Sequence, residues 1–263
     1  MSEHFNPCAR RDGLVYDFPT DRFRSKMFAW GFTPGAPADQ LLLEGAEGNA
    51  YYGFVYSGIA NLKAYGVGDY ALRRGMYFAV SGRFAITGGS GIVICDHGPL
   101  QPAVNGEASP RGSCVFQIGG PIEKFGRLRY IDGCTDSLLI APWLKGLPCL
   151  NHLHFPRRID QTEHTHPSFR LGIIVAGAGK CRTPDGVFDL TPGGFWCIPE
   201  GGVHAFMTDD STMDVIAYHP DSDFGPEHEN HPMVNRTLVE GVPSSQIPRI
   251  QTTAEQAQSA RQV

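Results

Sequence analysis

The chain has 263 residues, of which 41% are hydrophobic, and this apolar share is enough to build a packed core. No apolar run approaches the roughly 18 residues of a membrane-spanning helix, and the N-terminus lacks the apolar run of a signal peptide. The formal net charge of −5 argues against a dedicated nucleic-acid binder, which normally carries a basic excess. We therefore expect a soluble, cytoplasmic protein that binds neither membranes nor nucleic acids. The seven cysteines show no CxxC spacing, so reduced and mostly buried thiols are expected.

Short apolar runs separated by Gly- and Pro-containing turns follow one another along the chain, which predicts an all-β sandwich or barrel. Pro37–Glu44 is expected to form one or two turns of helix. The polar segment 99–113 is expected to be a loop between two halves, and Pro-Asp-Gly at 184–186 predicts a hairpin turn. Thr252–Gln262 has no apolar face and is expected to be a frayed tail. The expected strands are Tyr52–Tyr56, Met76–Val80, Arg83–Ile86, Gly91–Cys95, Ser113–Ile118, Arg127–Ile131, Ser137–Ile140, Leu150–Phe155, Leu171–Val175, Gly179–Thr183, Phe195–Ile198, His204–Met207 and Met213–Tyr218.

The two halves share an order of elements that suggests an internal duplication. Residues 70–94 and 187–216 each contain a glycine, an aromatic-apolar strand, a turn of small residues, a second strand and a final apolar strand. We therefore predict an N-terminal unit over 1–110 that includes an N-terminal extension, a C-terminal unit over 111–245 and a polar tail over 246–263.

Three histidines of the second half have a spacing typical of a metal site. His164 and His166 lie at positions i and i+2, so both rings point to one face of an extended chain. A metal ion can use both rings as neutral nitrogen donors. His204 follows a glycine-rich turn, and the intervening chain has the length of a meander that returns beside the first two. The alternative is that these histidines line a barrel that holds no metal.

At these positions the sequence resembles the cupin superfamily over roughly residues 150–220. The second cupin motif, G-x5-P-x-G-x2-H-x3-N, is matched except that Thr208 replaces Asn. The first motif, G-x5-H-x-H-x3,4-E-x6-G, is matched at both histidines and at Gly177, but Arg158 replaces the first Gly and Arg170 replaces Glu. The N-terminal half resembles a cupin only in pattern and lacks the histidines. The matched residues of the second motif are Gly193, Pro199, Gly201 and His204.

The resemblance implies a bicupin-like fold, with two jelly-roll-like β-barrels of which the N-terminal one is metal-free. It implies that His164, His166 and His204 hold one divalent metal ion. Because the Glu is missing, the ligands would be three neutral imidazoles that leave several coordination positions open, as in a catalytic site. Three-histidine cupins resemble ferrous dioxygenases, so Fe(II) is favoured over Zn, Mn and Ni. The resemblance also favours a homodimer formed through barrel edges.

Two further residues are candidates for a catalytic role. Arg170 stands where a metal-binding Glu is usual, and we expect it either to hold a substrate carboxylate or to turn outward and pair with a surface acid. His154 forms an i, i+2 pair with His152, and the pair could supply an acid/base group, support the ligands or belong to the barrel wall. Extra ligands from His228 and His231, in the loop after the last expected strand, have weaker support.

The leading hypothesis is a dioxygenase-like oxidoreductase that uses O2 and acts on a small molecule, with a carboxylate as one candidate group. A non-oxidative lyase or isomerase that uses the metal as a Lewis acid is the second hypothesis. A non-catalytic cupin that binds a small ligand is the third. The sequence contains no GxSxG, Walker A or HExxH motif.

Overall fold

The structure is a computed structural model, which describes residues 2–20, 23–35, 41–47, 49–97, 115–142, 147–221, 238–239, 241–243 and 246. The chain divides into two compact units, 1–222 and 223–263. Within the described part of the second unit, β21 (Leu238–Val239) and β22 (Val242–Pro243) form a two-stranded ribbon. The predicted loop at 99–113, the tail at 252–262, and His228 and His231 lie outside the described residues.

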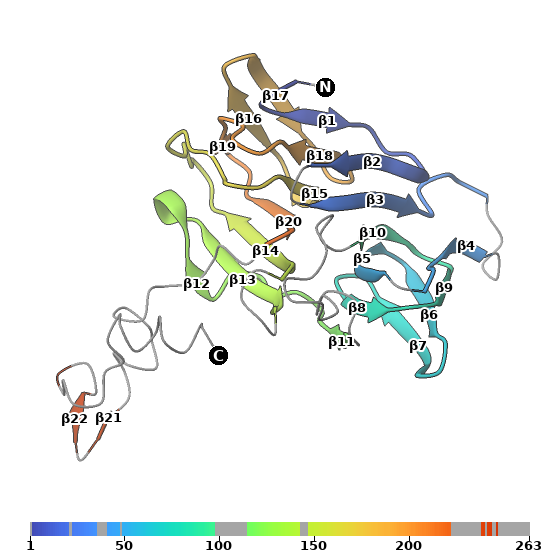
Figure 1. The fold of residues 1–263 in the computed structure, drawn as a ribbon. Coiled ribbons are helices and arrows are strands. Elements are labelled where there is room, and N and C mark those ends of the chain that lie inside the picture. The colour runs from blue at the N-terminus through green and yellow to red at the C-terminus, as the bar shows by residue number, and fades with distance from the viewer. Residues whose placement is uncertain are drawn as a thin grey trace, which may run out of the picture. The chain divides into compact units, whose positions relative to one another are not determined.

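The first unit contains two barrel-like pairs of sheets, which we call barrel 1 and barrel 2 (Figure 1). Barrel 1 is built mainly from the N-terminal half. The six strands of its larger sheet are, in spatial order, β2 (Gly13–Pro19), β3 (Arg24–Trp30), β10 (Ser90–Asp96), β5 (Ala50–Ser57), β8 (Tyr77–Ser81) and β11 (Phe116–Gly119). The smaller sheet contains β4 (Leu41–Glu44), β9 (Phe84–Thr87), β6 (Ile59–Ala64) and β7 (Gly68–Arg73).

Barrel 2 repeats this strand order in the C-terminal half. The seven strands of its larger sheet are, in spatial order, β12 (Leu128–Arg129), β13 (Thr135–Ile140), β14 (Cys149–Phe155), β20 (Met213–His219), β15 (Arg170–Gly177), β18 (Phe195–Ile198) and β1 (Asn6–Cys8). The smaller sheet contains β17 (Gly186–Leu190), β16 (Gly179–Thr183) and β19 (Ala205–Met207). A short 3-10 turn, Ile131–Gly133, precedes β13.

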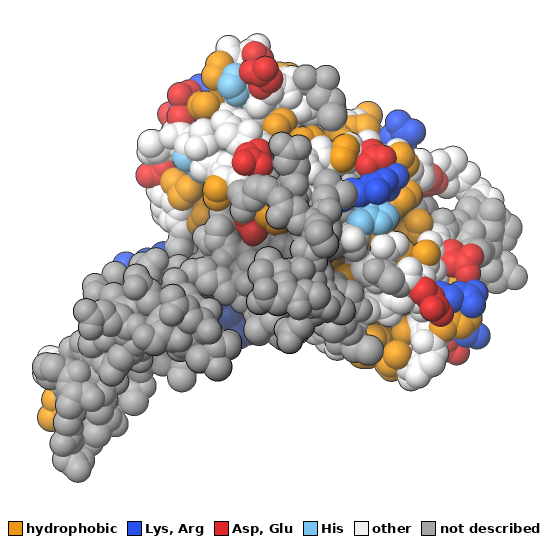
Figure 2. Space-filling view, in the orientation of Figure 1, with side chains coloured by type: hydrophobic (Ala, Val, Ile, Leu, Met, Phe, Trp, Pro, Cys, Tyr) orange, Lys and Arg blue, Asp and Glu red, His pale blue; other side chains and the backbone are white. Residues whose placement is uncertain are grey.

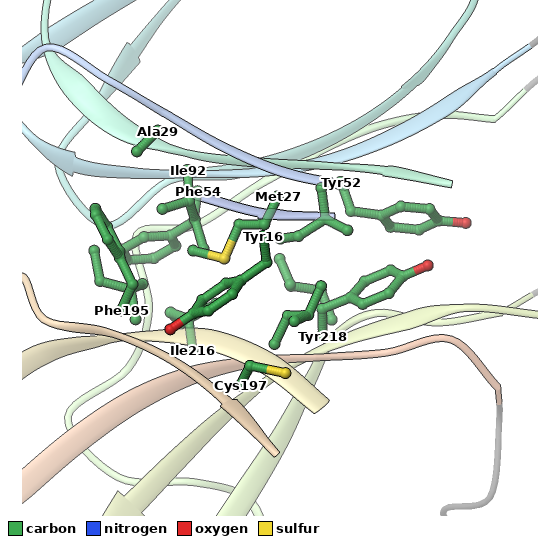
Figure 3. Close-up of a cluster of buried hydrophobic side chains, with 14 of the residues drawn as sticks. Tyr16, Met27, Ala29, Tyr52, Phe54, Ile92, Phe195, Cys197, Ile216 and Tyr218 are labelled. Carbon is green, nitrogen blue, oxygen red and sulfur yellow. The ribbon is translucent and has the colours of Figure 1, made fainter. Parts of the chain in front are cut away.

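The two larger sheets pack face to face, so their inner strands, such as β10 and β14, are buried on both sides. In barrel 2, Ile174 and Val215 face the core of that barrel, whereas Ile173 and Ile216 face the cluster shared with barrel 1. Figure 3 shows this shared cluster, with Phe195, Cys197, Ile216 and Tyr218 on one side and side chains of barrel 1 on the other. Because side chains alternate along a strand, two buried faces produce the continuous apolar runs seen in the sequence.

Each barrel receives one strand from the chain that precedes the other barrel. β1 comes before the strands of barrel 1 but pairs antiparallel with β18 of barrel 2. β11 comes before the strands of barrel 2 but pairs antiparallel with β8 of barrel 1. The exchange is therefore reciprocal. The larger sheet of barrel 2 ends in β1, which lies far from β18 in the sequence. The larger sheet of barrel 1 ends in β11, which lies beyond the connection between the halves.

The all-β, bicupin-like prediction is confirmed, and so is the hairpin at 184–186, which joins β16 to β17. The prediction of helix in Pro37–Glu44 is wrong for its described residues: Leu41–Glu44 is strand β4, which pairs with β9. Tertiary pairing decides this short segment, whose local preference is weak. The sequence analysis also missed β1, β2, β3, β6 and β7. No helix in the described part of the chain is long and apolar enough to cross a membrane.

Candidate metal centre

The three predicted histidines converge inside barrel 2. One ligating nitrogen from each of His164, His166 and His204 lies within 4.8 Å of the others. The ring centroids of His164 and His204 are 4.3 Å apart, and each is 5.1 Å from that of His166. His204 is 1% exposed. The sequence spacing thus brings together the residue set that it predicted.

Backbone pairing places His164 beside His204. The segment that follows β14 runs antiparallel to the chain entering β19, and the two histidines exchange both backbone hydrogen bonds, with N···O distances of 3.0 and 3.1 Å. Two residues on, the carbonyl of His166 accepts a hydrogen bond of 2.9 Å from the backbone N–H of Gly201. The turn needs glycine there, because Gly201 has a φ of +70°. These backbone hydrogen bonds hold the two segments that carry the three histidines next to each other.

The glycine position of the first motif keeps its conformation without a glycine. Arg158 has a φ of +61°, which is the left-handed region that β-carbon-bearing residues seldom adopt. Its backbone N–H donates to the carbonyl of Asp209 at 2.9 Å, which ties this turn to the end of β19. The departure from the motif therefore carries a conformational cost at Arg158.

Two of the rings are oriented by hydrogen bonds to backbone carbonyls. Nδ1 of His164 lies 2.9 Å from the carbonyl oxygen of Thr162, and Nδ1 of His204 lies 2.9 Å from that of Gly202. A carbonyl can only accept, so each Nδ1 donates and each Nε2 keeps its lone pair. Such a hydrogen bond is the usual support for a metal-binding imidazole, because it fixes both the tautomer and the ring direction.

Burial keeps two of the imidazoles neutral. The pKa of His166 is lowered to about 2, mainly by burial and next by the positive charge of Arg170. The pKa of His204 is lowered to about 4 by burial, against a hydrogen bond to Gly202 that acts in the opposite direction. Neutral rings are the form in which imidazole donates a lone pair to a metal.

The donor set fits a divalent metal ion. Imidazole nitrogens bind such ions at about 2.0–2.1 Å, so the nitrogens of one site lie at most about 4 Å apart. The observed limit of 4.8 Å needs only a small rotation of the rings. Three neutral nitrogen ligands without a carboxylate would leave the ion its full charge and several open positions, which suits a catalytic rather than a closed structural site.

Arg170 lies inside the same barrel. It occupies the first position of β15 and is 2% exposed, on the face that also carries Ile174. Its Nη1 donates to the backbone carbonyls of Ser168 and Phe169, each at 3.1 Å, and lies 3.6 Å from Oδ1 of Asp221. Its charge lowers the pKa of both His166 and His204, so it is electrostatically coupled to the centre. The alternative of an outward, surface-paired arginine does not match this burial.

His219 is a fourth histidine near the centre, one residue beyond Tyr218, where the last expected strand ended. It is the last residue of β20, and its ring centroid lies 6.4 Å from that of His166. Alternation could have found it, because Met213, Val215 and Ala217 on the same strand all face the core of barrel 2. Its positive form would further lower the pKa of His166.

His154 and His152 lie on the other face of the sheet. On β14 the core of barrel 2 takes Leu153 and Phe155, so the two histidines point away from it. Both contact Oδ1 of Asp214, at 2.9 Å from His152 Nε2 and 2.8 Å from His154 Nδ1. These hydrogen bonds lower the pKa of Asp214 although burial acts to raise it. The structure therefore does not bring His154 to the three-histidine group.

Comparisons with known proteins agree with this geometry at the level of the fold. A family model described as the AraC-like ligand binding domain matches residues 151–223, which contain all three histidines. No curated protein matches the chain.

Three solved structures show the extent of the structural likeness. A cupin 2 conserved barrel domain protein from Leptotrichia buccalis has a TM-score of 0.51 at 12% identity, covering 84% of this chain and 92% of that chain. The protein Ylba from E. coli has a TM-score of 0.56 at 17% identity, covering 86% and 93%. A salicylate 1,2-dioxygenase from Pseudaminobacter salicylatoxidans has a TM-score of 0.55 at 11% identity, covering 76% and 71%. The expected cupin fold is confirmed, and this chain contains that fold in two copies.

Proposed function

We propose that the protein is a metal-dependent oxidoreductase of dioxygenase type, which binds Fe(II) at His164, His166 and His204 and acts on a small molecule that carries a carboxylate. The observation that supports this most is the convergence of three imidazoles, two of them oriented by backbone carbonyls, with a buried arginine in one barrel interior. When bound, the ion would supply a Lewis-acidic, redox-active centre with positions open to substrate and dioxygen.

The chain's own residues would bind and orient the substrate. The guanidinium of Arg170 stays charged at any relevant pH and presents a planar fork of donors that matches a carboxylate. It faces the same interior as His166 and His204 and acts on the pKa of both. A substrate anion between the guanidinium and the metal would be attracted by both, which places the rest of the molecule next to the open coordination positions.

Aromatic side chains would keep water out of the site. The ring of Phe206 lies 5.7 Å from that of His204 and contacts Phe155 and Trp196, at centroid distances of 5.4 and 5.9 Å. All three aromatic residues belong to the core of barrel 2. A dry wall strengthens the pull of Arg170 on an anion and limits side reactions.

A second candidate is a non-catalytic barrel that binds a small ligand. The match of residues 151–223 to an AraC-like ligand binding domain favours it, because the matched segment is the one that holds the three histidines. In that case the imidazoles and Arg170 would recognise the ligand, and no turnover would follow binding.

The test combines metal analysis with oxygen uptake. Protein purified without oxygen is expected to carry about one iron per chain and to consume O2 with members of a panel of small aromatic and aliphatic carboxylates. Arg170→Met should raise KM for the active carboxylate about 10-fold or more, the loss of a charge-assisted hydrogen bond, whereas Arg170→Lys should lose less. Arg83→Met is the matched control, since Arg83 lies in the N-terminal half and pairs with exposed Glu44, away from the three histidines.

Each other outcome favours another function. Carboxylate binding without O2 uptake or product would favour the ligand-binding barrel. Product formed without O2 uptake would favour the non-oxidative lyase or isomerase. Equal KM values for Arg170→Met and wild type, in folded protein, would contradict the role of Arg170 as a carboxylate anchor.

A further inference from the structure

We propose that the N-terminal arm, Ser2–Cys8, is a positioning device for the metal centre, and that His4 acts through Val203 and Gly202 to hold the ring of His204. This inference rests on the proposed metal centre for its purpose. Its hydrogen bonds, however, involve only residues of this chain, so they can be measured in protein prepared without metal.

The arm is anchored in barrel 2 along its whole length. β1 pairs with β18 in the register Asn6 with Cys197, and Cys8 with Phe195. Phe5 is 1% exposed within the core of barrel 2, and its ring lies 5.4 Å from that of Phe188. A fully buried Phe removes roughly 150–250 Å² of surface from water, so the arm is held by more than backbone pairing.

Local hydrogen bonds make the start of the arm rigid. The side chain of Asn6 and the backbone of Ser2 exchange two hydrogen bonds, of 2.7 and 2.9 Å. The hydroxyl of Ser2 accepts from the backbone N–H of His4 at 3.0 Å and donates to the carboxylate of Asp185. His4 is therefore presented to barrel 2 in one conformation.

The arm meets barrel 2 at the turn that carries His204. The backbone N–H of Val203 donates to Nδ1 of His4 at 3.2 Å. At Gly202 a Cβ atom would lie 2.7 Å from the carbonyl oxygen of His4 and 3.2 Å from that of Glu3, so the two backbones touch. The arm therefore packs against one side of this turn, and the side chain of His4 accepts the hydrogen bond from the Val203 amide.

This contact reaches the imidazole through one peptide. The carbonyl of Gly202 is the group that accepts the hydrogen bond from Nδ1 of His204 and so leaves Nε2 free for a ligand. The same peptide unit, Gly202–Val203, donates its N–H to His4. This one planar peptide therefore connects the arm to the ring of His204, and its rotation would break both hydrogen bonds together. His4 is a positioning residue, 199 positions away from its partner in sequence.

Two variants at position 4 separate positioning from simple packing. His4→Asn keeps an acceptor where Nδ1 stands, whereas His4→Leu keeps the bulk and removes the acceptor. Arg10→Ala is the matched control: Arg10 also joins the N-terminal segment to barrel 2, through the carbonyl of Pro192, but it does not touch the His204 turn.

The first measurement uses metal-free protein. Nitrogen-15 NMR of the imidazoles should show His204 as a single Nδ1–H tautomer in wild type, His4→Asn and Arg10→Ala. In His4→Leu we expect a mixture of tautomers and amide exchange at Val203 that is at least about 10-fold faster, because the amide loses its partner. An unchanged tautomer and unchanged exchange in folded His4→Leu would overturn the inference.

The second measurement is metal affinity by competition with a coloured chelator, using Co²⁺ or Fe²⁺ without oxygen. His4→Leu should bind the ion about 10-fold more weakly, the effect expected when the support of a ligating imidazole is removed, and the other two variants should match wild type. If wild type binds no metal while His4→Leu still alters the His204 tautomer, the proposed function fails and the positioning role stands.

Discussion

The two barrels use one backbone frame for two different interiors. In barrel 2 the backbone N–H of His164 donates to the carbonyl of His204 at 3.0 Å, and in barrel 1 the N–H of Gly45 donates to the carbonyl of Phe84 at 2.9 Å. Each hydrogen bond joins the segment that leads into β15 or β5 to the start of the strand that follows a turn, β19 or β9. The candidate ligands His164 and His204 thus correspond to Gly45 and Phe84 in barrel 1.

In barrel 1 an aromatic ring fills the space that corresponds to the three-histidine group of barrel 2. A Cβ atom on Gly45 would lie 2.2 Å from Cε1 of Phe84, so the ring occupies the volume that a side chain at position 45 would need. Phe84 is fully buried, and its ring packs against that of Tyr51 at 4.8 Å. Glu47, two residues after Gly45 as His166 is after His164, is exposed. A few side chains therefore decide whether this frame holds polar ligands or an apolar plug.

On the face shown in Figure 2, acidic and basic side chains are interspersed among the described residues. The contrast between Phe84 and the histidines lies in buried side chains, so it is tested best by substitutions of buried residues.

The largest expected effect is the loss of metal from barrel 2. His204→Ala removes one of three ligands and should abolish binding, since even the loss of a residue that only supports a ligand costs 10–100-fold in affinity. Metal content after loading and desalting should fall from about one ion per chain to none. Phe84→Ala, at the corresponding position of barrel 1, should leave it at one; equal loss in both variants would contradict the assignment of the centre to barrel 2.

The next largest expected effect is on the free energy of unfolding, and it concerns the buried ring of Phe84 in barrel 1. Phe84→Ala should lower the free energy of unfolding by about 3–5 kcal/mol, the usual cost of truncating a buried aromatic residue. Gly45→Ala should cost about 1–3 kcal/mol through overpacking. In the double variant the costs should be less than additive, because the smaller residue at 84 makes room for the new methyl group. Urea denaturation of the four proteins measures this coupling, and strict additivity would argue against contact between the two positions.

A smaller effect is the acid sensitivity of metal-free barrel 2. The pKa values of His166 and His204, about 2 and about 4, lie below the value near 6.5 of an unfolded histidine. Between pH 6.5 and 4.5 the unfolded chain therefore binds more protons, and each residue should lower the stability by about 2 kcal/mol as the pH falls.

The measured quantity in that experiment is the difference between wild type and His204→Gln. Buried Asp136, with a pKa raised to about 6, titrates in the same range with the opposite sign. This contribution is common to both proteins and cancels in the difference. His204→Gln should lose stability less steeply below pH 6.5, and parallel curves for the two proteins would contradict the depressed pKa of His204.

The smallest expected effect concerns Arg158, where barrel 2 holds a positive φ without a glycine. The chain leaving the corresponding strand of barrel 1, β3, uses Gly31 with a φ of +71°. Arg158→Gly should raise the unfolding free energy by about 0.5–1 kcal/mol by removing left-handed strain. The ion pair it loses with Asp210 is exposed and worth little. A loss of stability would show that the arginine side chain contributes more than its conformation costs.

The sequence predicts the centre better than it predicts its surroundings. The i, i+2 spacing is enough to predict that His164 and His166 point to one face. The glycines before His204 are enough to predict the turn that precedes it. The orientation of His154 could not be predicted in this way, because all seven residues of β14 are buried. Alternation on that strand therefore does not say which face points into the barrel interior. β1 is only three residues long and pairs with a strand about 190 positions away, and no local pattern encodes such a partner.

The crossing of β1 and β11 means that a cut between the halves does not separate two finished bodies. A fragment ending near residue 110 would lack β11 and leave β8 with an open edge, and its complement would lack β1 and leave β18 open in the same way. Open edges invite pairing with other chains. Two single-barrel molecules that traded their leading strands would, once joined end to end, have this connectivity. The molecule is then a fused pair of barrels that have exchanged strands, and barrel 1 and barrel 2 should unfold in one cooperative transition.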